Sequence, residues 1–105
     1  MADVKAIFYL PVRDNDGRTL MHEIARVRDE LFRMFAGWTS LGYVKGAFRV
    51  ADGSRSLDTS AAYMVVLDES RMNELESDLR NFKRQTTQEA IYMEVHRDID
   101  IRFVR

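Results

Sequence analysis

The sequence predicts a two-layer α+β fold in which two helices cover one side of an antiparallel sheet. Two amphipathic helical patterns, each flanked by strand-like runs, are the observations that predict it. Apolar residues recur every three or four positions over 20–35 and again over 72–82. This spacing puts the apolar side chains on one stripe of each helix, so each helix has one face to bury against a sheet.

The first half of the chain begins with a central strand. Residues 6–10 are apolar or aromatic at every position, which is typical of a strand that is covered on both sides. The polar run 14–17 predicts a turn, after which Thr19 caps the first helix. Gly37 is predicted to end this helix, because glycine accepts the left-handed conformation that closes many helices.

The second half of the chain begins with a hairpin. Segments 42–51 and 60–67 are strand-like, and an Asp-Gly-Ser turn follows the first of them. Asp68 or Ser70 is predicted to cap the second helix, whose acidic first turn and basic last turn suit the helix dipole.

Two further alternating segments complete the sheet. In 90–96 and in 99–104, apolar and polar residues alternate with the period of two that a half-buried strand has. The predicted order is therefore β-α-β-β-α-β with a short extra C-terminal strand. Right-handed crossovers then put both helices on the same side of the antiparallel sheet, which is the ferredoxin-like α+β sandwich.

Length and composition predict a single domain over residues 1–105 that needs no metal or cofactor to stay folded. A chain of 105 residues buries about 60–70% of the surface that its unfolded form exposes. The sequence contains no cysteine, which excludes thiol catalysis, zinc–thiolate sites and disulfides. It has neither a secretion signal nor an apolar run of about 20 residues, so we expect a cytoplasmic protein that does not enter a membrane.

The charge balance argues against nucleic acid as a partner. Sixteen basic and seventeen acidic residues leave a formal net charge of −1, so no overall field attracts phosphate backbones. The run 45–50 resembles the aromatic strand of RNA-recognition domains, but it lacks one of the aromatic residues that stack on bases.

The predicted sandwich leaves one face of the sheet uncovered, and strand alternation assigns residues to the two faces. The residues expected on the helix side are Phe8, Leu10, Phe48, Val50, Met64, Val66, Ile91, Met93 and Val95. Those expected on the open side are Ile7, Tyr9, Ala47, Arg49, Tyr63, Val65, Tyr92 and His96. A shift of one residue in the third strand would exchange Tyr63 and Val65 for Met64 and Val66.

So many apolar side chains on one face indicate a partner or ligand surface. We expect a homodimer that packs sheet against sheet and encloses a small hydrophobic ligand pocket, because two-fold association commonly covers such a surface. The candidate binding residues are Ile7, Tyr9, Arg49, Tyr63, Tyr92 and His96. His96, at a strand end, is either a general base or part of the dimer interface.

Two loops supply further candidates. Trp38 and Thr39 follow the first helix, where the tryptophan either closes the end of the core or contacts a ligand. Gln88 and Glu89 precede the fourth strand, where they either cap backbone groups or point into a pocket.

Several short motifs resemble a set of small bacterial proteins for which no activity is established. They are Phe-Ala-Gly-Trp-Thr at 35–39, Gly-x-Phe at 46–48, Phe-Lys at 82–83, Gln-Glu-Ala-Ile at 88–91 and the closing Val104. In that set a Phe-Gly-Gly-x-Thr loop follows the first helix, and a Gln-Glu-(Ala/Ser)-Val segment leads into the last strands. The resemblance implies the ferredoxin-like fold, and it nominates Trp38, Thr39, Gln88 and Glu89 without assigning them a role.

Two functional hypotheses remain from the sequence. The first is a non-catalytic homodimeric domain that binds a small molecule or a protein partner through its open sheet face. The second is a cofactor-free enzyme of the dimeric α+β barrel kind, with His96, Tyr9, Tyr92 and Arg49 around an apolar pocket. A filled interface favours the first hypothesis, and a cavity of roughly 300 Å³ or more with convergent polar groups favours the second.

Overall fold

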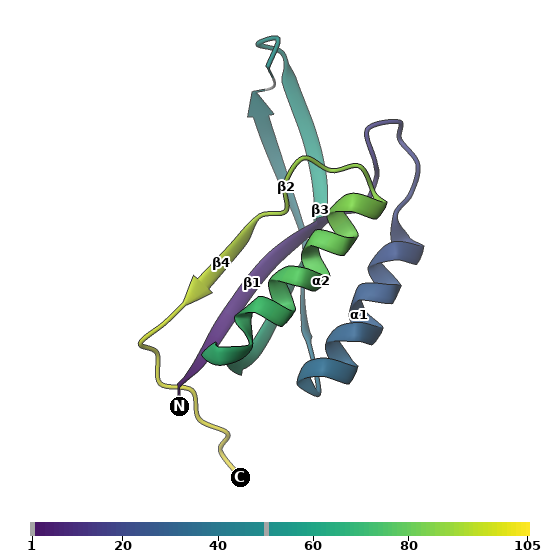
Figure 1. Ribbon diagram of the computed structural model, residues 1–105. Coiled ribbons are helices and arrows are strands. Elements are labelled where there is room, and N and C mark those ends of the chain that lie inside the picture. Colours follow the sequence, from purple (N-terminus) through teal and green to yellow (C-terminus); the bar gives the residue numbers. More distant parts are fainter. Residues whose placement is uncertain (1, 50) are drawn as a thin grey trace.

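A computed structural model describes residues 2–49 and 51–105, and the predictions for Val50 and for the side chain of Phe48 lie outside this description. The chain forms four strands and two α-helices, with one 3₁₀ turn before the second helix (Figure 1). In chain order the elements are β1 (Asp3–Pro11), α1 (Met21–Phe35), β2 (Thr39–Arg49), β3 (Arg55–Asp68), η1 (Glu69–Arg71), α2 (Met72–Gln85) and β4 (Met93–His96).

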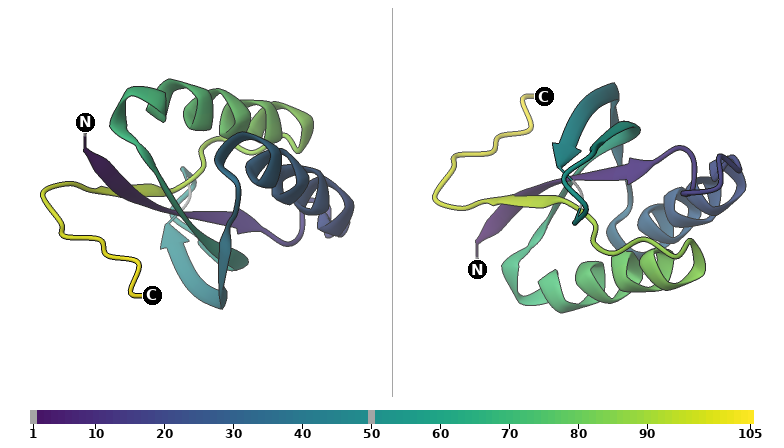
Figure 2. Two further views of the ribbon diagram at one scale, coloured as in Figure 1. Left: turned by 90° about the horizontal axis from the view of Figure 1, so that it is seen from below. Right: turned by 90° about the horizontal axis from the view of Figure 1, so that it is seen from above.

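The four strands form one antiparallel sheet in the order β2-β3-β1-β4. Both helices pack on the same face of this sheet, and the other face is left without a helix (Figures 1 and 2). The predicted ferredoxin-like α+β sandwich is therefore confirmed. No helix of the described residues is long and apolar enough to cross a bilayer.

The core lies between the helices and the sheet, where the two predicted apolar stripes are buried. Side chains from α1 and α2 meet alternate residues of β1 and β3, so burial follows a period of two along each strand. The buried side chains of the sheet are Val4, Ala6, Phe8, Leu10, Ala61, Ala62, Tyr63, Val65 and Leu67. Those of the helices and their ends are Leu20, Ile24, Val27, Leu31, Met72, Leu75, Leu79 and Phe82.

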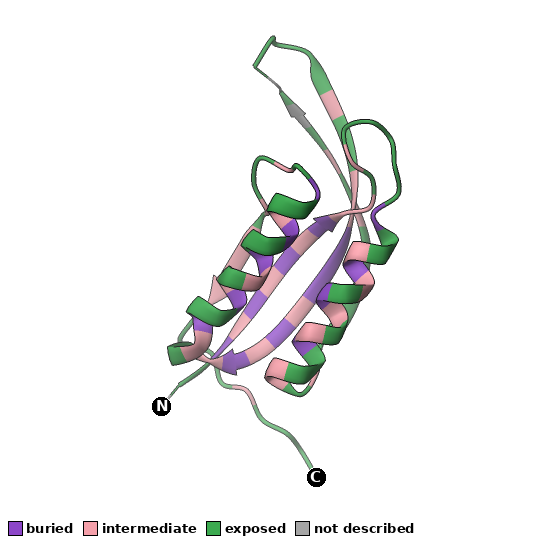
Figure 3. Ribbon diagram, turned by 45° about the vertical axis from the view of Figure 1, so that its right-hand side comes forward, coloured by how far each residue is buried: buried purple, intermediate pink, exposed green. Residues whose placement is uncertain are grey.

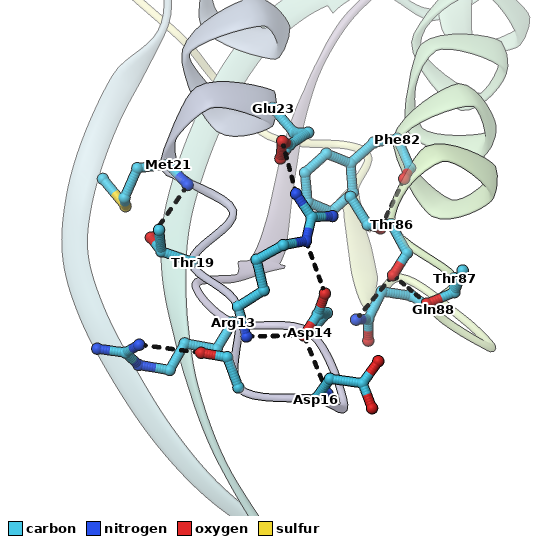
Figure 4. A network of polar contacts seen from close by, with 12 residues as sticks. Arg13, Asp14, Asp16, Thr19, Met21, Glu23, Phe82, Thr86, Thr87 and Gln88 are labelled. Atoms are coloured by element: carbon cyan, nitrogen blue, oxygen red, sulfur yellow. Dashed lines mark hydrogen bonds and ion pairs between the residues drawn. The ribbon is translucent and has the colours of Figure 1, made fainter.

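A polar turn fixes the start of α1 (Figure 4). The carboxylate of Asp14 accepts a hydrogen bond from the backbone N–H of Arg18 at 2.8 Å and pairs with its guanidinium at 3.0 Å. The same guanidinium reaches Glu23 on α1 at 3.6 Å. The N-cap of α1 is Leu20 without a side-chain cap, so the prediction that Thr19 caps the helix was wrong by one residue. Thr19 precedes the cap and accepts from the N–H of Met21 at 3.4 Å.

The hairpin of β2 and β3 is longer than the sequence predicted and projects beyond the rest of the fold. Its strands span Thr39–Arg49 and Arg55–Asp68 rather than 42–51 and 60–67. The molecule measures 48 × 25 × 24 Å, and the exposed far end of the hairpin accounts for the long dimension (Figure 3). The distal hairpin therefore has no helix packed against it.

The predicted extra strand at 99–104 is absent from the described residues. The last strand is β4, which spans Met93–His96 rather than 90–96. After β4 the backbone turns at Asp98, whose φ is +56°, and Arg97 forms an ion pair with Glu69. This turn directs the following residues away from the edge of the sheet, so their alternation finds no neighbouring strand.

The assignment of faces in β3 was wrong by one residue. Tyr63 pairs with Phe8 and Val65 pairs with Ala6, and directly opposed residues share a face of the sheet. Tyr63 is only 4% exposed and lies in the core beneath the helices. Met64 and Val66 take the open side instead, because β3 is apolar at both parities and only its pairing with β1 determines its faces.

Candidate functional site

The uncovered side of the sheet, which we call the open face, carries side chains from three adjacent strands. Ile7 lies between Met64 on β3 and Glu94 on β4, while Lys5 lies between Val66 and His96. Tyr9 and Tyr92 continue the same face toward the hairpin. The open face comprises Lys5, Ile7, Tyr9, Ala62, Met64, Val66, Tyr92, Glu94 and His96.

An aromatic pair forms one end of the open face. The rings of Tyr9 and Tyr92 stack with their centroids 4.6 Å apart and their planes 22° from parallel. The backbone N–H of Tyr9 donates to the carbonyl of Tyr92 at 3.1 Å, which holds the chain before β4 alongside β1. Tyr92 is 53% exposed, so the stack is accessible to a ligand from solvent.

A chain of hydrogen bonds connects this aromatic pair to the end of β4. The hydroxyl of Tyr92 donates to Glu94 at 2.7 Å, and Nε2 of His96 lies 2.8 Å from the other oxygen of the same carboxylate. All three residues have the same parity, so the period of a strand brings them into line. The middle member is therefore a carboxylate with both oxygens engaged.

These contacts determine the charge state of the open face. The hydrogen bonds from Tyr92 and His96, together with the charges of His96 and Lys5, hold the pKa of Glu94 below its ordinary value. The same Glu94 carboxylate raises the pKa of the Tyr92 hydroxyl, because it accepts a hydrogen bond from the neutral hydroxyl and repels the charged phenolate. At neutral pH the face thus presents a carboxylate and a neutral phenol.

The middle of the open face is aliphatic. Ile7, Met64 and Val66 are half-buried, which is typical of side chains that only their neighbours in the sheet cover. Methionine adapts to partners of different shape, because its side chain is unbranched and flexible. The arrangement combines an aromatic platform, an aliphatic floor and an anionic centre, which is the usual composition of a small-molecule site.

The structure separates two of the predicted site residues from this group. Tyr63 lies in the core, as described above. Arg49 pairs with Arg55 near the far end of the hairpin. Arg55 and Tyr63 lie on the same face of β3, so Arg49 shares the face of Tyr63 rather than that of Ile7. The prediction that Arg49 belongs to the open face was therefore wrong, because the register shift between Ser40 and Gly42 exchanges the faces of the residues that follow in β2.

Of the first predicted loop, Trp38 closes the core and Thr39 borders the open face. The indole of Trp38 packs edge-on against the ring of Tyr63 at 5.6 Å, and the guanidinium of Arg28 lies 5.5 Å above the indole. Thr39 pairs with Met64 at the start of β2, so it shares the side of Met64.

Of the second predicted loop, Gln88 bonds to backbone groups and Glu89 borders a groove. Gln88 donates from its backbone N–H to the carbonyl of Lys83 at 3.1 Å and from its side chain to that of Thr86 at 3.4 Å (Figure 4). Glu89 borders a groove of about 570 Å³ between α2 and the chain that leads into β4. This groove lies beside the helix and has an apolar floor of Leu79, Ile91 and Met93.

A second cavity, of about 420 Å³, lies where the C-terminal segment approaches the end of the sheet. It is lined by Val66 and Leu67 of β3, by Phe35 at the end of α1 and by Phe103. Val66 belongs to the open face, so this cavity adjoins the aliphatic part of the site.

The sequence reading missed Glu94 and Lys5 as site residues, and it named Met64 and Val66 only as the alternative to Tyr63 and Val65. Glu94 has the parity of Tyr92 and His96, so the strand period was a sufficient signal for it. Within residues 2–49 and 51–105, no group of three or more acidic or histidine side chains is arranged to hold a metal ion.

The sequence matches no protein-family model and no curated protein sequence. Among solved structures, a phage SAM lyase in complex with S-methyl-5′-thioadenosine has a similar fold, with a TM-score of 0.70. The similarity covers 90% of this chain and 81% of that chain at 10% sequence identity. At this identity the similarity supports the fold and carries no activity with it.

Proposed function

We propose that the chain is a small-molecule-binding domain whose open face takes a planar aromatic ligand. The observation that carries the proposal is the accessible stack of Tyr9 and Tyr92, which continues through hydrogen bonds into Glu94 and His96. Aromatic side chains bind heteroaromatic rings by stacking, and neighbouring polar groups set the orientation. The phage SAM lyase supports the class of ligand, because a thioadenosine occupies that protein of similar fold.

The proposal is tested by titrating the chain with S-methyl-5′-thioadenosine in a calorimeter. Base stacking on an aromatic side chain contributes about 1–3 kcal/mol, so Tyr9→Ala is expected to weaken binding about 5- to 150-fold. Phe32→Ala is the matched control, since Phe32 is an exposed aromatic residue of α1 outside the open face. Equal affinities of the wild type and Tyr9→Ala would remove the open face as the site.

The carboxylate of Glu94 makes a further distinction among ligands. Because Glu94 stays charged, we expect S-adenosylmethionine, which carries a sulfonium cation, to bind more tightly than the neutral thioadenosine. Glu94→Gln keeps the shape of the side chain and removes its charge, so it is expected to reduce this preference. An unchanged preference in Glu94→Gln would show that the ligand's cation lies elsewhere.

A second candidate function is catalysis on the same face. The imidazole of His96 is 2.8 Å from the carboxylate of Glu94, an arrangement that orients the ring for proton transfer. The test incubates the chain with S-adenosylmethionine and follows release of S-methyl-5′-thioadenosine by chromatography. Release by the wild type and its loss in His96→Asn would favour the enzyme over the non-catalytic domain.

A further inference from the structure

The segment Ile99–Val104 has the sequence of a strand and lies outside the sheet. Ile99, Ile101 and Phe103 alternate with Asp100 and Arg102. In the described part of the chain the last strand nevertheless ends at His96. On the apolar side of this pattern, Ile99 is 38% exposed and Phe103 is 69% exposed, while Ile101 is partly buried, so this side is only partly covered in a single copy.

The path of this segment leads toward the open face. Arg97 pairs with Glu69, and the positive φ of Asp98 turns the backbone away from β4. Both views in Figure 2 show the segment after β4 on the side of the sheet opposite the helices. Phe103 lines the 420 Å³ cavity at the end of the sheet, where Val66 of the open face meets residues 32–36 at the end of α1.

The strand β2 provides the complementary feature at the other edge of the sheet. Among the described residues β2 pairs only with β3, so one side of its backbone is free along Thr39–Arg49. Its side chains Leu41 and Tyr43 are 48% and 66% exposed. A long edge strand with exposed apolar residues is a template for pairing with another strand.

Within one chain these two features lie at opposite edges. The segment leaves the sheet from β4, and the sheet order places β1 and β3 between β4 and β2. A two-fold axis resolves this separation, because it brings the segment of each copy to β2 of the other and covers the β2 edges of both copies at once. A second copy of this chain is therefore the occupant that fits both features.

The size of the open face supports the same conclusion. A face of three strands spaced about 4.8 Å apart and about six residues long has a footprint of about 300 Å². Stable interfaces bury about 800 Å² on each partner. Contact of the two open faces is therefore too small by itself, and an exchanged strand supplies the remaining area.

We propose that two copies pack open face to open face and that each adds Ile99–Val104 as a strand to β2 of the other. The inference rests on the proposed function in one respect, since the ligand site would then lie between the two copies. Phe103 would be covered by the partner, and the exposed residues of the β2 edge would lie beneath the exchanged strand.

Light scattering after size-exclusion chromatography tests the proposal over 5–200 µM protein. The wild type is expected at twice the 12.3 kDa mass of the chain. A variant that ends at Asp98 and the variant Phe103→Asp are expected at the single-chain mass, or with dissociation constants raised at least tenfold. Arg102→Ala is the matched control on the polar side of the segment, and its dissociation constant is expected to change less than threefold.

Hydrogen exchange locates the contact even if the shortened chain folds poorly. Amides of 99–104 and 41–48 are expected to be protected at 200 µM and to lose protection together on dilution. A wild type that is a single chain at 200 µM, or a shortened chain that dimerises as tightly as the wild type, would overturn the proposal. Calorimetry with S-methyl-5′-thioadenosine on the same samples separates the two ideas, since a monomer that binds the nucleoside retains the proposed function without the exchanged strand.

Discussion

The two faces of the sheet are built from alternate residues of the same strands, yet they differ in nearly every physical property. On the helix side, Phe8 is fully buried and packs against Tyr63 with the ring centroids 6.2 Å apart. On the open side, the neighbouring Tyr9 is half-buried and stacks on Tyr92, whose hydroxyl bonds to a carboxylate. The comparison indicates that one face is used for stability and the other is free for recognition.

The largest expected effect on the free energy of unfolding comes from replacing Phe8 by alanine, and replacing the neighbouring Tyr9 provides the comparison. Phe8→Ala removes a fully buried ring and leaves a cavity, so it is expected to destabilise the fold by about 3–5 kcal/mol. Tyr9→Ala removes a half-exposed ring and its stack, so about 1 kcal/mol is expected. Urea unfolding of the two variants checks both values. Equal losses would mean that the open face belongs to a second core.

The helix side has a polar defect at Asp78 of α2, close to Glu30 and Arg33 of α1. Burial and the nearby charge of Glu30 raise the pKa of Asp78 from 3.8 to about 6, while Arg33 opposes this shift. Among the described residues, one oxygen of the Asp78 carboxylate is buried without a hydrogen-bond partner. The folded protein therefore binds the proton of Asp78 more tightly than the unfolded chain does. This proton binding stabilises the folded state fully below about pH 4, and the stabilisation is lost as the pH rises through 6.

Asp78→Asn is therefore expected to stabilise the protein above pH 7. A shift of two pKa units corresponds to about 3 kcal/mol, which solvent around this half-buried group reduces to about 1 kcal/mol. Thermal unfolding at pH 4 and at pH 7.5 measures the stability of Asp78→Asn relative to the wild type, and the gain in stability is expected only at the higher pH. Asp29→Asn, at an exposed position of α1, is the charge-matched control and should leave both values nearly unchanged. A gain of equal size at both pH values would contradict this origin.

The same contrast explains how much of the fold the sequence could predict. Both helices and the hairpin follow from local periodicity, since Leu20–Phe35 and Met72–Phe82 each carry a continuous apolar stripe. The faces of β3 do not follow, because Ala61–Leu67 is apolar at both parities and only the pairing of Tyr63 with Phe8 decides between them. Local patterns thus predict elements better than they predict partners.

The candidate site shows the same division. Ile7, Tyr9, Tyr92 and His96 were assigned to the open side by alternation, and the structure places them there together. Arg49 was misplaced because a register shift between Ser40 and Gly42 exchanges the faces of β2, and alternation within β2 does not reveal this shift. The segment 99–104 alternates like a strand, but alternation does not specify a neighbour, and none is present among the described residues of one copy.

A smaller effect is expected at the end of α1, where the helix side meets the loop before β2. Ala36 closes the helix in the left-handed conformation, with φ at +63° and its N–H bonded to the carbonyl of Phe32. A residue with a side chain in this conformation costs about 1 kcal/mol relative to glycine. Glycine loses part of this advantage, because its unfolded chain has more conformational freedom to give up on folding. Ala36→Gly is therefore expected to stabilise the fold by about 0.5 kcal/mol.

Urea unfolding measures this gain, and the adjacent Gly37 supplies the control. Gly37 has open space around the position of a β-carbon, and its φ is not positive. Gly37→Ala is thus expected to leave stability unchanged or to raise it slightly. A loss of stability in Ala36→Gly would show that the Cβ of Ala36 contributes packing that outweighs its backbone strain.

The smallest effect on stability is expected from Glu94→Gln, and it is the sharpest test of the division between the faces. Glu94 accepts bonds from Tyr92 and His96, but the network is open to solvent, and exposed polar contacts of this kind contribute little to folding. We expect the midpoint of urea unfolding at pH 7 to stay nearly the same as that of the wild type. If the open face is a recognition surface, the same variant changes ligand preference while leaving the fold intact. A large loss of stability in Glu94→Gln would instead mean that the carboxylate holds β4 to β1, and the open face would then be as structural as the face beneath the helices.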